Sequence, residues 1–285
     1  APVLGGTITL TDGITPQFNP YSICENDPVN LPTESINGIV GVWQPTANAG
    51  EYEFSPVEGQ CALNTTMTII VKPRPAVIVD NLPVVNTICS GESINLLLSS
   101  LVPNATFSWN SFNANGVSGH SSSIIGTPLT FINQTLTLNP GVTSPKEVIY
   151  YIYAEADGCL GEVTEVSITV NPVPNVVVKG DNPSTICSGE TTNISFDESV
   201  TDTVFNWVVQ SSTGVSGAFD GQGSVLAQQL STTGLSQGQV VYKVTPTFNN
   251  CTGTSVEVTV FVNPIPPFFG DNSNHPELCS GVDLT

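Results

Sequence analysis

The chain has 285 residues, of which 10% are charged, and its formal net charge is −19 because 24 acidic residues face five basic ones. Without a cluster of lysine and arginine, little can neutralise phosphate groups, so nucleic-acid binding and contact with an anionic membrane surface are disfavoured. The length is too great for one small domain and suits two to four. β-Branched residues, glycine, proline and asparagine dominate, which is typical of short strands joined by turns. We therefore predict an all-β protein.

No stretch of the sequence suggests a membrane segment. The opening APVLGGTITLTDG has neither the basic start nor the apolar centre of a signal peptide. No apolar run approaches the roughly 18 residues that a bilayer requires. We therefore expect no direct membrane insertion, and a mature or excised piece of a longer protein.

Three units follow one another in chain order, and each repeats the same arrangement. A short cysteine-bearing segment, TICSGE in two copies, is followed 19 or 20 residues later by a tryptophan. A second cysteine then stands in a turn, before an alternating strand that ends at proline. The three sets are Cys24, Trp43 and Cys61; Cys89, Trp109 and Cys159; and Cys187, Trp207 and Cys251.

The prolines after each final strand predict the boundaries, because proline fixes φ and removes a backbone donor. We expect the end of an upstream unit or a linker in residues 1–13, and a short immunoglobulin-like repeat in 14–74. Two longer repeats should occupy 75–173 and 174–265, followed in 266–285 by the start of a truncated further repeat.

The second unit shows its expected strands most clearly. Short β-prone runs are separated by Gly, Asn, Asp and Pro, and a tryptophan stands on the third run. The runs are AVIVD, ESINLLLSS, TFSWNS, TFINQTLTL, EVIYYIYAEA and TEVSITV. This spacing predicts an immunoglobulin-like β-sandwich, repeated as an extended array. Trp43, Trp109 and Trp207 are then expected in the cores between the sheets.

The seven cysteines indicate disulfides more than metal binding or catalysis. There is no CxxC pair and there are only two histidines, His120 and His275, so the spacing of zinc ligands is absent. A catalytic cysteine would need a histidine base, which the first and third complete units lack. Repeated disulfides in an oxidising, extracellular setting are the better interpretation.

Two disulfide frameworks fit the count. Pairing within units leaves Cys279 unpaired in this chain and gives Cys24–Cys61, Cys89–Cys159 and Cys187–Cys251. Pairing between units, always across 28 residues, leaves Cys24 and gives Cys61–Cys89, Cys159–Cys187 and Cys251–Cys279. We favour the first framework, since an extended array would hold the second set beyond the Cα limit of about 7 Å. One difficulty is that the first turn and last hairpin of a simple immunoglobulin sandwich lie at opposite ends.

The phrase TICSGE, the tryptophan, the (D/N)xC turn and the ending VxVTVNP resemble the PKD-like and immunoglobulin-like tandem repeats of very large Bacteroidota surface adhesins. The resemblance covers about residues 14 to 285. It implies that 75–173 and 174–265 are PKD-like repeats. It also implies a protein related to the SprB-type gliding-motility adhesins, which the type IX secretion system exports.

Few residues suggest chemistry. There is no GxSxG elbow, phosphate-binding glycine loop or HExxH motif, so we do not expect an enzyme. Asp197, Glu198 and Asp202 would offer oxygen ligands to Ca²⁺, the one cofactor considered, although solvated surface charge is the simpler interpretation. Thr203 lies in an Asp-Thr-Val triplet like the O-glycosylation acceptor of the bacteria that the resemblance implies.

We therefore expect a non-catalytic segment of a secreted bacterial cell-surface adhesin. It would act as a stalk or filament that presents a distal adhesive region, and the process that the resemblance implies for it is gliding motility. Its partners would be neighbouring repeats of the same polypeptide, with surface polysaccharide or a substratum beyond them. Two alternatives stay open: a carbohydrate- or cell-binding module, and the accessory domains of a secreted hydrolase.

Overall fold

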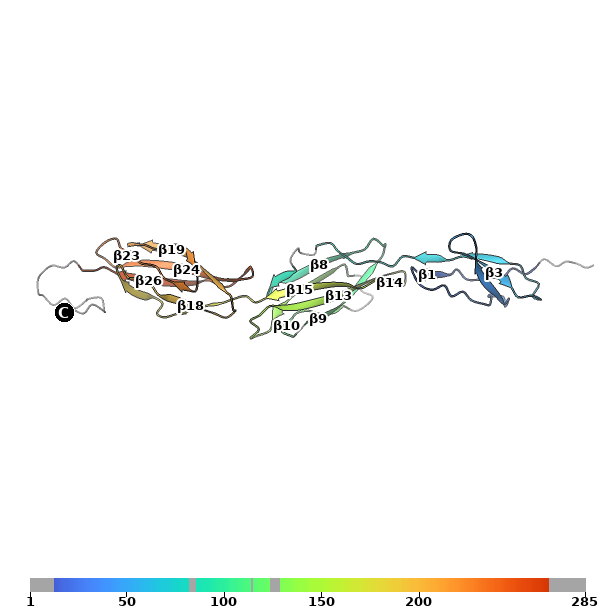
Figure 1. The fold of residues 1–285 in the computed structure, drawn as a ribbon, viewed down its shortest axis with the longest axis horizontal. Helices are drawn as coiled ribbons and strands as arrows, with labels where there is room; N and C mark the ends of the chain where they lie inside the picture. Colours follow the sequence, from blue (N-terminus) through green and yellow to red (C-terminus); the bar gives the residue numbers. More distant parts are fainter. Residues whose placement is uncertain (1–12, 82–85, 114, 124–128, 267–285) are drawn as a thin grey trace, which may run out of the picture.

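The computed structural model describes residues 13–81, 86–113, 115–123 and 129–266. Throughout these ranges the regular elements are β-strands, and none of the described residues forms a helix, so none could cross a membrane as one. The strands form three units that follow one another along the long axis of the molecule (Figure 1). The expected all-β tandem architecture is confirmed.

The first unit is small. A parallel pair joins β1 to β5, and an antiparallel meander joins β2, β3 and β4. Phe54 is fully buried and packs against Phe18 and Trp43, with ring centroids 4.8 and 5.1 Å away. Trp43 is only partly buried, and its Nε1 donates to the Pro32 carbonyl at 2.8 Å. The strands are β1 (Ser22–Cys24), β2 (Gly41–Pro45), β3 (Glu51–Pro56), β4 (Thr65–Thr68) and β5 (Ile70–Lys72).

The second unit is a sandwich of two larger sheets. One has the order β11-β8-β6, and the other β14-β13-β15-β7 with β9 also paired to β13. Alternate residues of β13 are buried, as expected for a strand with one face on the core, and Trp109 belongs to the same cluster. The strands are β6 (Ile78–Val79), β7 (Thr87–Cys89), β8 (Ser93–Ser99), β9 (Thr106–Asn113), β10 (Val117–Ser118), β11 (Phe131–Thr135), β12 (Thr137–Leu138), β13 (Lys146–Ala156), β14 (Cys159–Leu160) and β15 (Thr164–Asn171).

The third unit repeats this sandwich. Its sheets have the orders β16-β18-β22 and β17-β26-β24-β19-β21, with β25 on β24, and Trp207 lies in the core. The strands are β16 (Val176–Lys179), β17 (Ser184–Cys187), β18 (Ile194–Glu198), β19 (Val204–Thr213), β20 (Val215–Ser216), β21 (Gly221–Gln222), β22 (Val225–Leu226), β23 (Ser231–Thr232), β24 (Gly238–Phe248), β25 (Cys251–Thr252) and β26 (Val256–Asn263).

The cysteine-bearing strand of each unit, which is the first strand of the first unit and the second strand of each longer unit, lies parallel to the end of that unit's last strand. β1 pairs with β5, β7 with β15, and β17 with β26. The last strand leads directly into the linker to the next unit, so the cysteine on the paired strand lies at the exit end of its unit. The residues opposite each other are Cys24 and Lys72, Cys89 and Asn171, and Cys187 and Asn263.

The second cysteine of each longer unit lies at the entry end. Cys159 and Cys251 begin the short strands β14 and β25, which form hairpins with the ends of β13 and β24. The last strand of the unit starts shortly after them. The incoming linker packs on the same hairpins. A Cβ added to Gly161 would lie 1.7 Å from the Pro75 carbonyl oxygen, and one added to Gly253 1.8 Å from that of Pro174. Only glycine two residues after the cysteine admits this approach.

Candidate functional site

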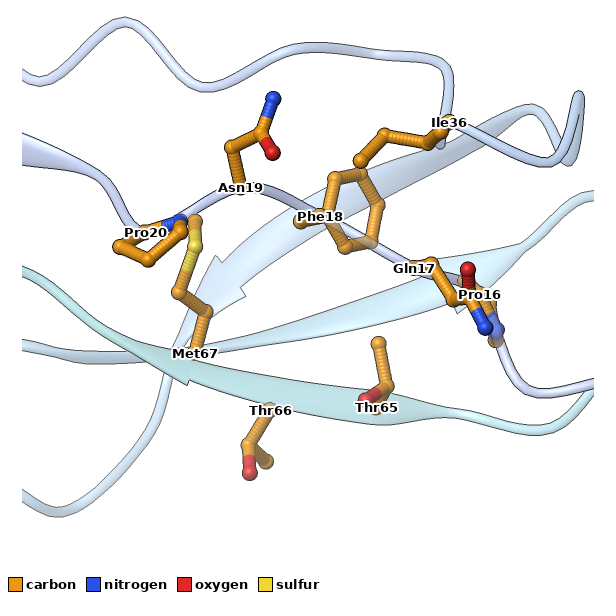
Figure 2. Close-up of a pocket in the computed structure, with 9 residues that line it drawn as sticks. All are labelled: Pro16, Gln17, Phe18, Asn19, Pro20, Ile36, Thr65, Thr66 and Met67. Carbon is orange, nitrogen blue, oxygen red and sulfur yellow. The ribbon is translucent and has the colours of Figure 1, made fainter.

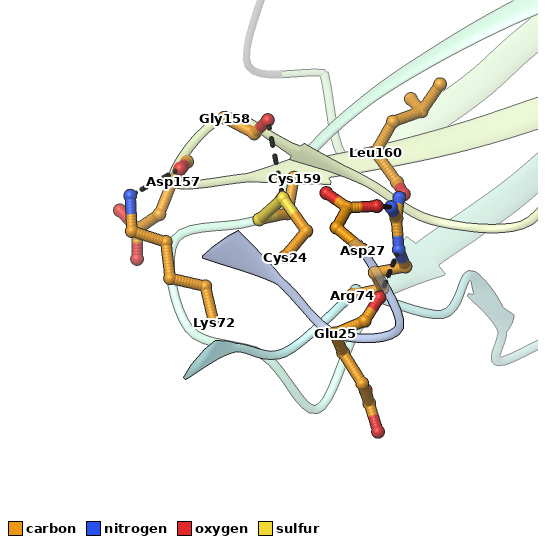
Figure 3. Close-up of a disulfide and its surroundings, with 9 residues drawn as sticks. All are labelled: Cys24, Glu25, Asp27, Lys72, Arg74, Asp157, Gly158, Cys159 and Leu160. Carbon is orange, nitrogen blue, oxygen red and sulfur yellow. Dashed lines mark hydrogen bonds and ion pairs between the residues drawn. A yellow bond between two sulfur atoms is a disulfide. The ribbon is translucent and has the colours of Figure 1, made fainter. Parts of the chain in front are cut away.

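The feature that distinguishes this array is the junction between units, where disulfides join one unit to the next. Cys24 bonds to Cys159 and Cys89 bonds to Cys251, each with Cα atoms 5.5 Å apart. Figure 3 shows the first bond, between the end of β1 and the hairpin strand β14. Each bond therefore links the exit end of one unit to the entry end of its successor.

The pairing within units that we favoured from the sequence is wrong. Cys24 is bonded to Cys159 instead of Cys61, which is a free, exposed thiol. Cys89 and Cys159 lie at opposite ends of one sandwich, because the parallel pairing of β7 with β15 carries Cys89 to the exit end. The length of the sandwich thus separates the two residues that we had paired.

The alternative framework with 28-residue separations is also wrong, since Cys89, Cys159 and Cys251 are bonded to other partners. Cys187 is also disulfide-bonded, but the predicted pairs Cys187–Cys251 and Cys159–Cys187 are both wrong, because Cys251 is bonded to Cys89 and Cys159 to Cys24. Cys279, which we expected to be unpaired, lies outside the described residues, as does His275.

At the first junction Arg74 connects the two units through polar contacts (Figure 3). Its Nε donates to the Glu25 carbonyl at 2.8 Å, and its Nη2 forms an ion pair with Asp27, both in the first unit. Its Nη1 donates to the Leu160 carbonyl of the second unit at 2.5 Å. A planar guanidinium can make all three contacts at once, which holds the hairpin of the second unit against the turn after β1.

A second basic side chain crosses this junction. Lys72 Nζ donates to the carbonyl of Asp157 at 3.0 Å, on the other side of the disulfide in Figure 3. Two of the five basic residues of the chain therefore serve one junction. The sequence placed both in the proline-rich boundary segment, but their role could not be inferred until the hairpin was placed beside them.

The second junction has a different character. A cavity of about 670 Å³ is lined by residues of both units, among them Cys89, Asn171 and Cys251. Asn171 is 2% exposed and its Nδ2 has no hydrogen-bond partner. The described residues give no hydrogen bond between the two units here, so the disulfide is the principal connection beside the linker.

A groove of about 490 Å³ lies on the first unit, between the segment before β1 and strand β4 (Figure 2). Its lining offers apolar, amide and hydroxyl groups and no acidic, basic or cysteine side chain, so it lacks an acid–base pair for catalysis. The residues are Pro16, Gln17, Phe18, Asn19, Pro20, Ile36, Thr65, Thr66 and Met67. Ser111 Oγ and His120 Nδ1 lie 2.9 Å apart elsewhere and belong to neither cavity.

The acidic residues considered for calcium are not gathered around one point. Asp197 forms an ion pair with Lys179 at 2.6 Å, and Glu198 accepts a hydrogen bond from the Thr203 backbone. Asp202 occupies a turn with a φ of 66°. Over the described ranges no group of three His, Cys, Asp or Glu side chains could hold a metal. The Thr203 hydroxyl, considered for glycosylation, donates to a backbone carbonyl three residues earlier at 2.5 Å.

Taken together, the fold and its junctions define a tandem array of immunoglobulin-like β-sandwiches, with disulfides between successive units. The family profile of the PKD-like domain matches residues 86–174 and 184–266, which is more than half of the chain. The chain belongs to the PKD-like domain family.

Among solved structures, extracellular domains 3–5 of Drosophila OTK match with 9% identity and a TM-score of 0.39, covering 75% of this chain and 70% of that one. The I-band fragment I67–I69 of titin matches with 8% identity and a TM-score of 0.36, covering 75% and 74%. The N-terminal four Ig domains of Dscam1 match with 10% identity and a TM-score of 0.29, covering 75% and 53%. Similarities at this level do not bear on function. A search of curated protein sequences finds no match.

Proposed function

We propose that this chain is a non-catalytic repeat segment of a secreted bacterial surface adhesin, in which successive units form a stalk that presents a distal adhesive region. The observation that carries the proposal is the disulfide at each junction, which runs from the exit end of one unit to the entry end of the next. Such a connection favours end-to-end extension and opposes folding back of one unit on another.

The location at a cell surface rests on two supports. Disulfides form and persist in oxidising compartments, so two of them within the described residues favour an extracellular protein. The resemblance of the repeats to the SprB-type adhesins extends the proposal to Bacteroidota, type IX secretion and gliding motility. The partners in this proposal are neighbouring repeats of the same polypeptide, with polysaccharide or a substratum met by the distal region.

Small-angle X-ray scattering of the purified, oxidised chain tests the spacer role. We expect an elongated particle with one narrow distribution of end-to-end distances, as in the arrangement of Figure 1. Reduction with dithiothreitol should broaden the distribution, because only linkers and the contacts of Arg74 and Lys72 then orient the units. A compact or broadly distributed oxidised particle would contradict the spacer role, and selective binding on a glycan array would favour a carbohydrate-binding module instead.

A further inference from the structure

The two disulfides overlap along the chain. The first closes the loop from Cys24 to Cys159, with a separation of 135 residues. The second begins at Cys89, inside that loop, and ends at Cys251, outside it, with a separation of 162 residues. The bonds therefore interlock three units, whereas bonds within units would have closed each unit on itself.

We propose that these interlocked bonds give the array a further function: they carry tension along a short covalent path that bypasses most of the folded polypeptide. A chain under tension cannot extend beyond its shortest covalent path. Between Cys89 and Cys251 that path is one sulfur–sulfur bond, so the residues between them are excluded from extension. This property depends on covalent connectivity and goes beyond the spacer role proposed above.

The position of the bonds at the ends of the units makes the path short. From Cys251 the chain runs along β26 to Asn263, so 12 residues cross the third unit from its entry end to its exit end. Fully extended, 12 residues span about 40 Å. Strand β24 in the folded unit has 11 residues, which span about 37 Å. The third unit therefore cannot lengthen appreciably along this path, even if it unfolds.

The second unit bears tension along its last strand only while it is folded, because Cys159 and Cys89 are not bonded to each other. β15 runs from just after the hairpin to Asn171 at the exit end, and lies beside Cys89 there. In the folded unit a force applied to Cys24 passes through its disulfide to Cys159 and along β15 to the next linker. If this unit unfolds, the shortest covalent path from Cys24 to Cys251 is the backbone from Cys24 to Cys89 followed by the second disulfide, so the second unit lengthens and its core resists the tension until then.

The shortest covalent path between Ile14 and Ile265 can be read from the connectivity. It follows the backbone from Ile14 to Cys89, crosses to Cys251, and continues to Ile265, which leaves roughly 90 residues under tension, or about 300 Å when extended. Without disulfides about 250 residues are under tension, or about 860 Å. The second bond alone determines the shorter value.

Single-molecule stretching of the full chain by its two ends tests this proposal. Cys61, Cys187 and Cys279 are replaced by alanine throughout, so that only the four cysteines of the two described bonds are left. Four molecules are compared: this parent, the parent with C24A and C159A, the parent with C89A and C251A, and the parent with all four replaced. Non-reducing peptide mapping establishes the bonds that each molecule contains.

The connectivity predicts three different contour lengths between Ile14 and Ile265 for the four molecules. The parent and the C24A/C159A variant should both extend to about 300 Å, the C89A/C251A variant to about 400 Å, and the molecule without cysteines to about 860 Å. The terminal segments add the same length to all four. Reduction with dithiothreitol should increase the contour lengths of the parent and the two double variants to that of the molecule without cysteines.

The critical result is that the parent and the C24A/C159A variant have equal contour lengths, because bonds within units would not produce this equality. A parent that extends as far as the molecule without cysteines overturns the proposal, and so does a C24A/C159A variant that extends further than the parent. Because contour length is measured after unfolding, loss of stability in a variant does not affect the comparison. An array that is elongated in scattering yet extends fully would refute the tension path and leave the spacer role standing.

Discussion

The first unit and the two longer units hold their sheets together in different ways. The longer units each have a continuous apolar core, in which residues such as Tyr150 and Tyr242 are fully buried. The first unit buries far fewer apolar side chains, namely Ile39, Phe54 and Ile69. A small core supplies little free energy of unfolding by itself. The comparison therefore teaches that the first unit depends on its junction, whereas the longer units depend on their interiors.

Replacing the tryptophans should separate the two kinds of unit most strongly. We expect Trp207→Ala to destabilise the third unit by about 3–5 kcal/mol, because the side chain fills a buried position between the sheets. Trp43→Ala should cost about 1–2 kcal/mol, since the ring is partly exposed before the change. Differential scanning calorimetry of the two variants measures the effects, and equal losses would contradict the proposed difference between the cores.

Removal of the first disulfide should affect the first unit next most strongly. The double variant C24A/C159A is expected to lower the stability of the first unit by about 2–4 kcal/mol, because a long closed loop is released in the unfolded chain. The calorimetric transition of the third unit should stay in place. C89A/C251A is the matched control, and it should leave the first unit unchanged. A first unit that melts at its original temperature in C24A/C159A would show that it does not depend on the junction.

The buried tyrosines predict a pH dependence for the longer units. The Tyr242 hydroxyl donates to Gln228 Oε1 at 2.8 Å, and burial raises the pKa of Tyr242 to about 12. The unfolded chain, with a tyrosine pKa near 10, releases this proton first as the pH rises. The contribution of Tyr242 to the free energy of unfolding of the third unit is therefore fully present below about pH 10. It is lost between about pH 10 and 12, at up to roughly 1.4 kcal/mol per pH unit.

Tyr242→Phe tests this contribution. The variant should weaken the dependence of the third unit on pH above 10, as measured by urea unfolding at a series of pH values. Tyr150, whose pKa burial also raises, should maintain the dependence in the second unit and so provides an internal control. An unchanged slope for the third unit in the variant would assign its alkaline instability to other groups.

The smallest effect is expected at Arg74. The side chains of Arg74 and Asp27 are 33% and 41% exposed, so solvent screens their ion pair, and Arg74→Ala should cost less than about 1 kcal/mol. Scattering should still detect a broader distribution of angles between the first two units. Arg74→Lys should behave like alanine here, because an ammonium cannot replace the forked contacts to Asp27 and Leu160. Unchanged scattering for both variants would show that Arg74 does not help to orient the first two units and that the disulfide suffices.

The sequence predicted the strands and the repeating sandwich because alternation of apolar and polar residues is local information. Trp109 and Trp207 could be placed between sheets on the same basis. The disulfides could not be predicted in this way, because spacing along the chain does not say at which end of a sandwich a residue lies. Three residues of β7, parallel to β15, decide that for Cys89.

One signal in the sequence pointed to the entry end. Gly161 and Gly253 stand two residues after Cys159 and Cys251, where the incoming linker approaches, while Leu63 holds that place after Cys61. The shared glycine marks a hairpin crowded by the linker from the preceding unit. Together with the opposite placement of first strand and last hairpin, it would have favoured bonds from one unit to the next.

The overlap of the two bonds also dictates an order of events during biosynthesis. If the chain is exported with its N-terminus first, Cys24 can meet Cys61 and Cys89 before its native partner Cys159 has been exported. Cys89 likewise has to wait for Cys251, past two intervening cysteines. Correct oxidation therefore requires that each unit folds first and keeps its thiols apart, or that an isomerase corrects early pairings. Until the third unit has folded, the second unit therefore carries Cys89 as an open thiol.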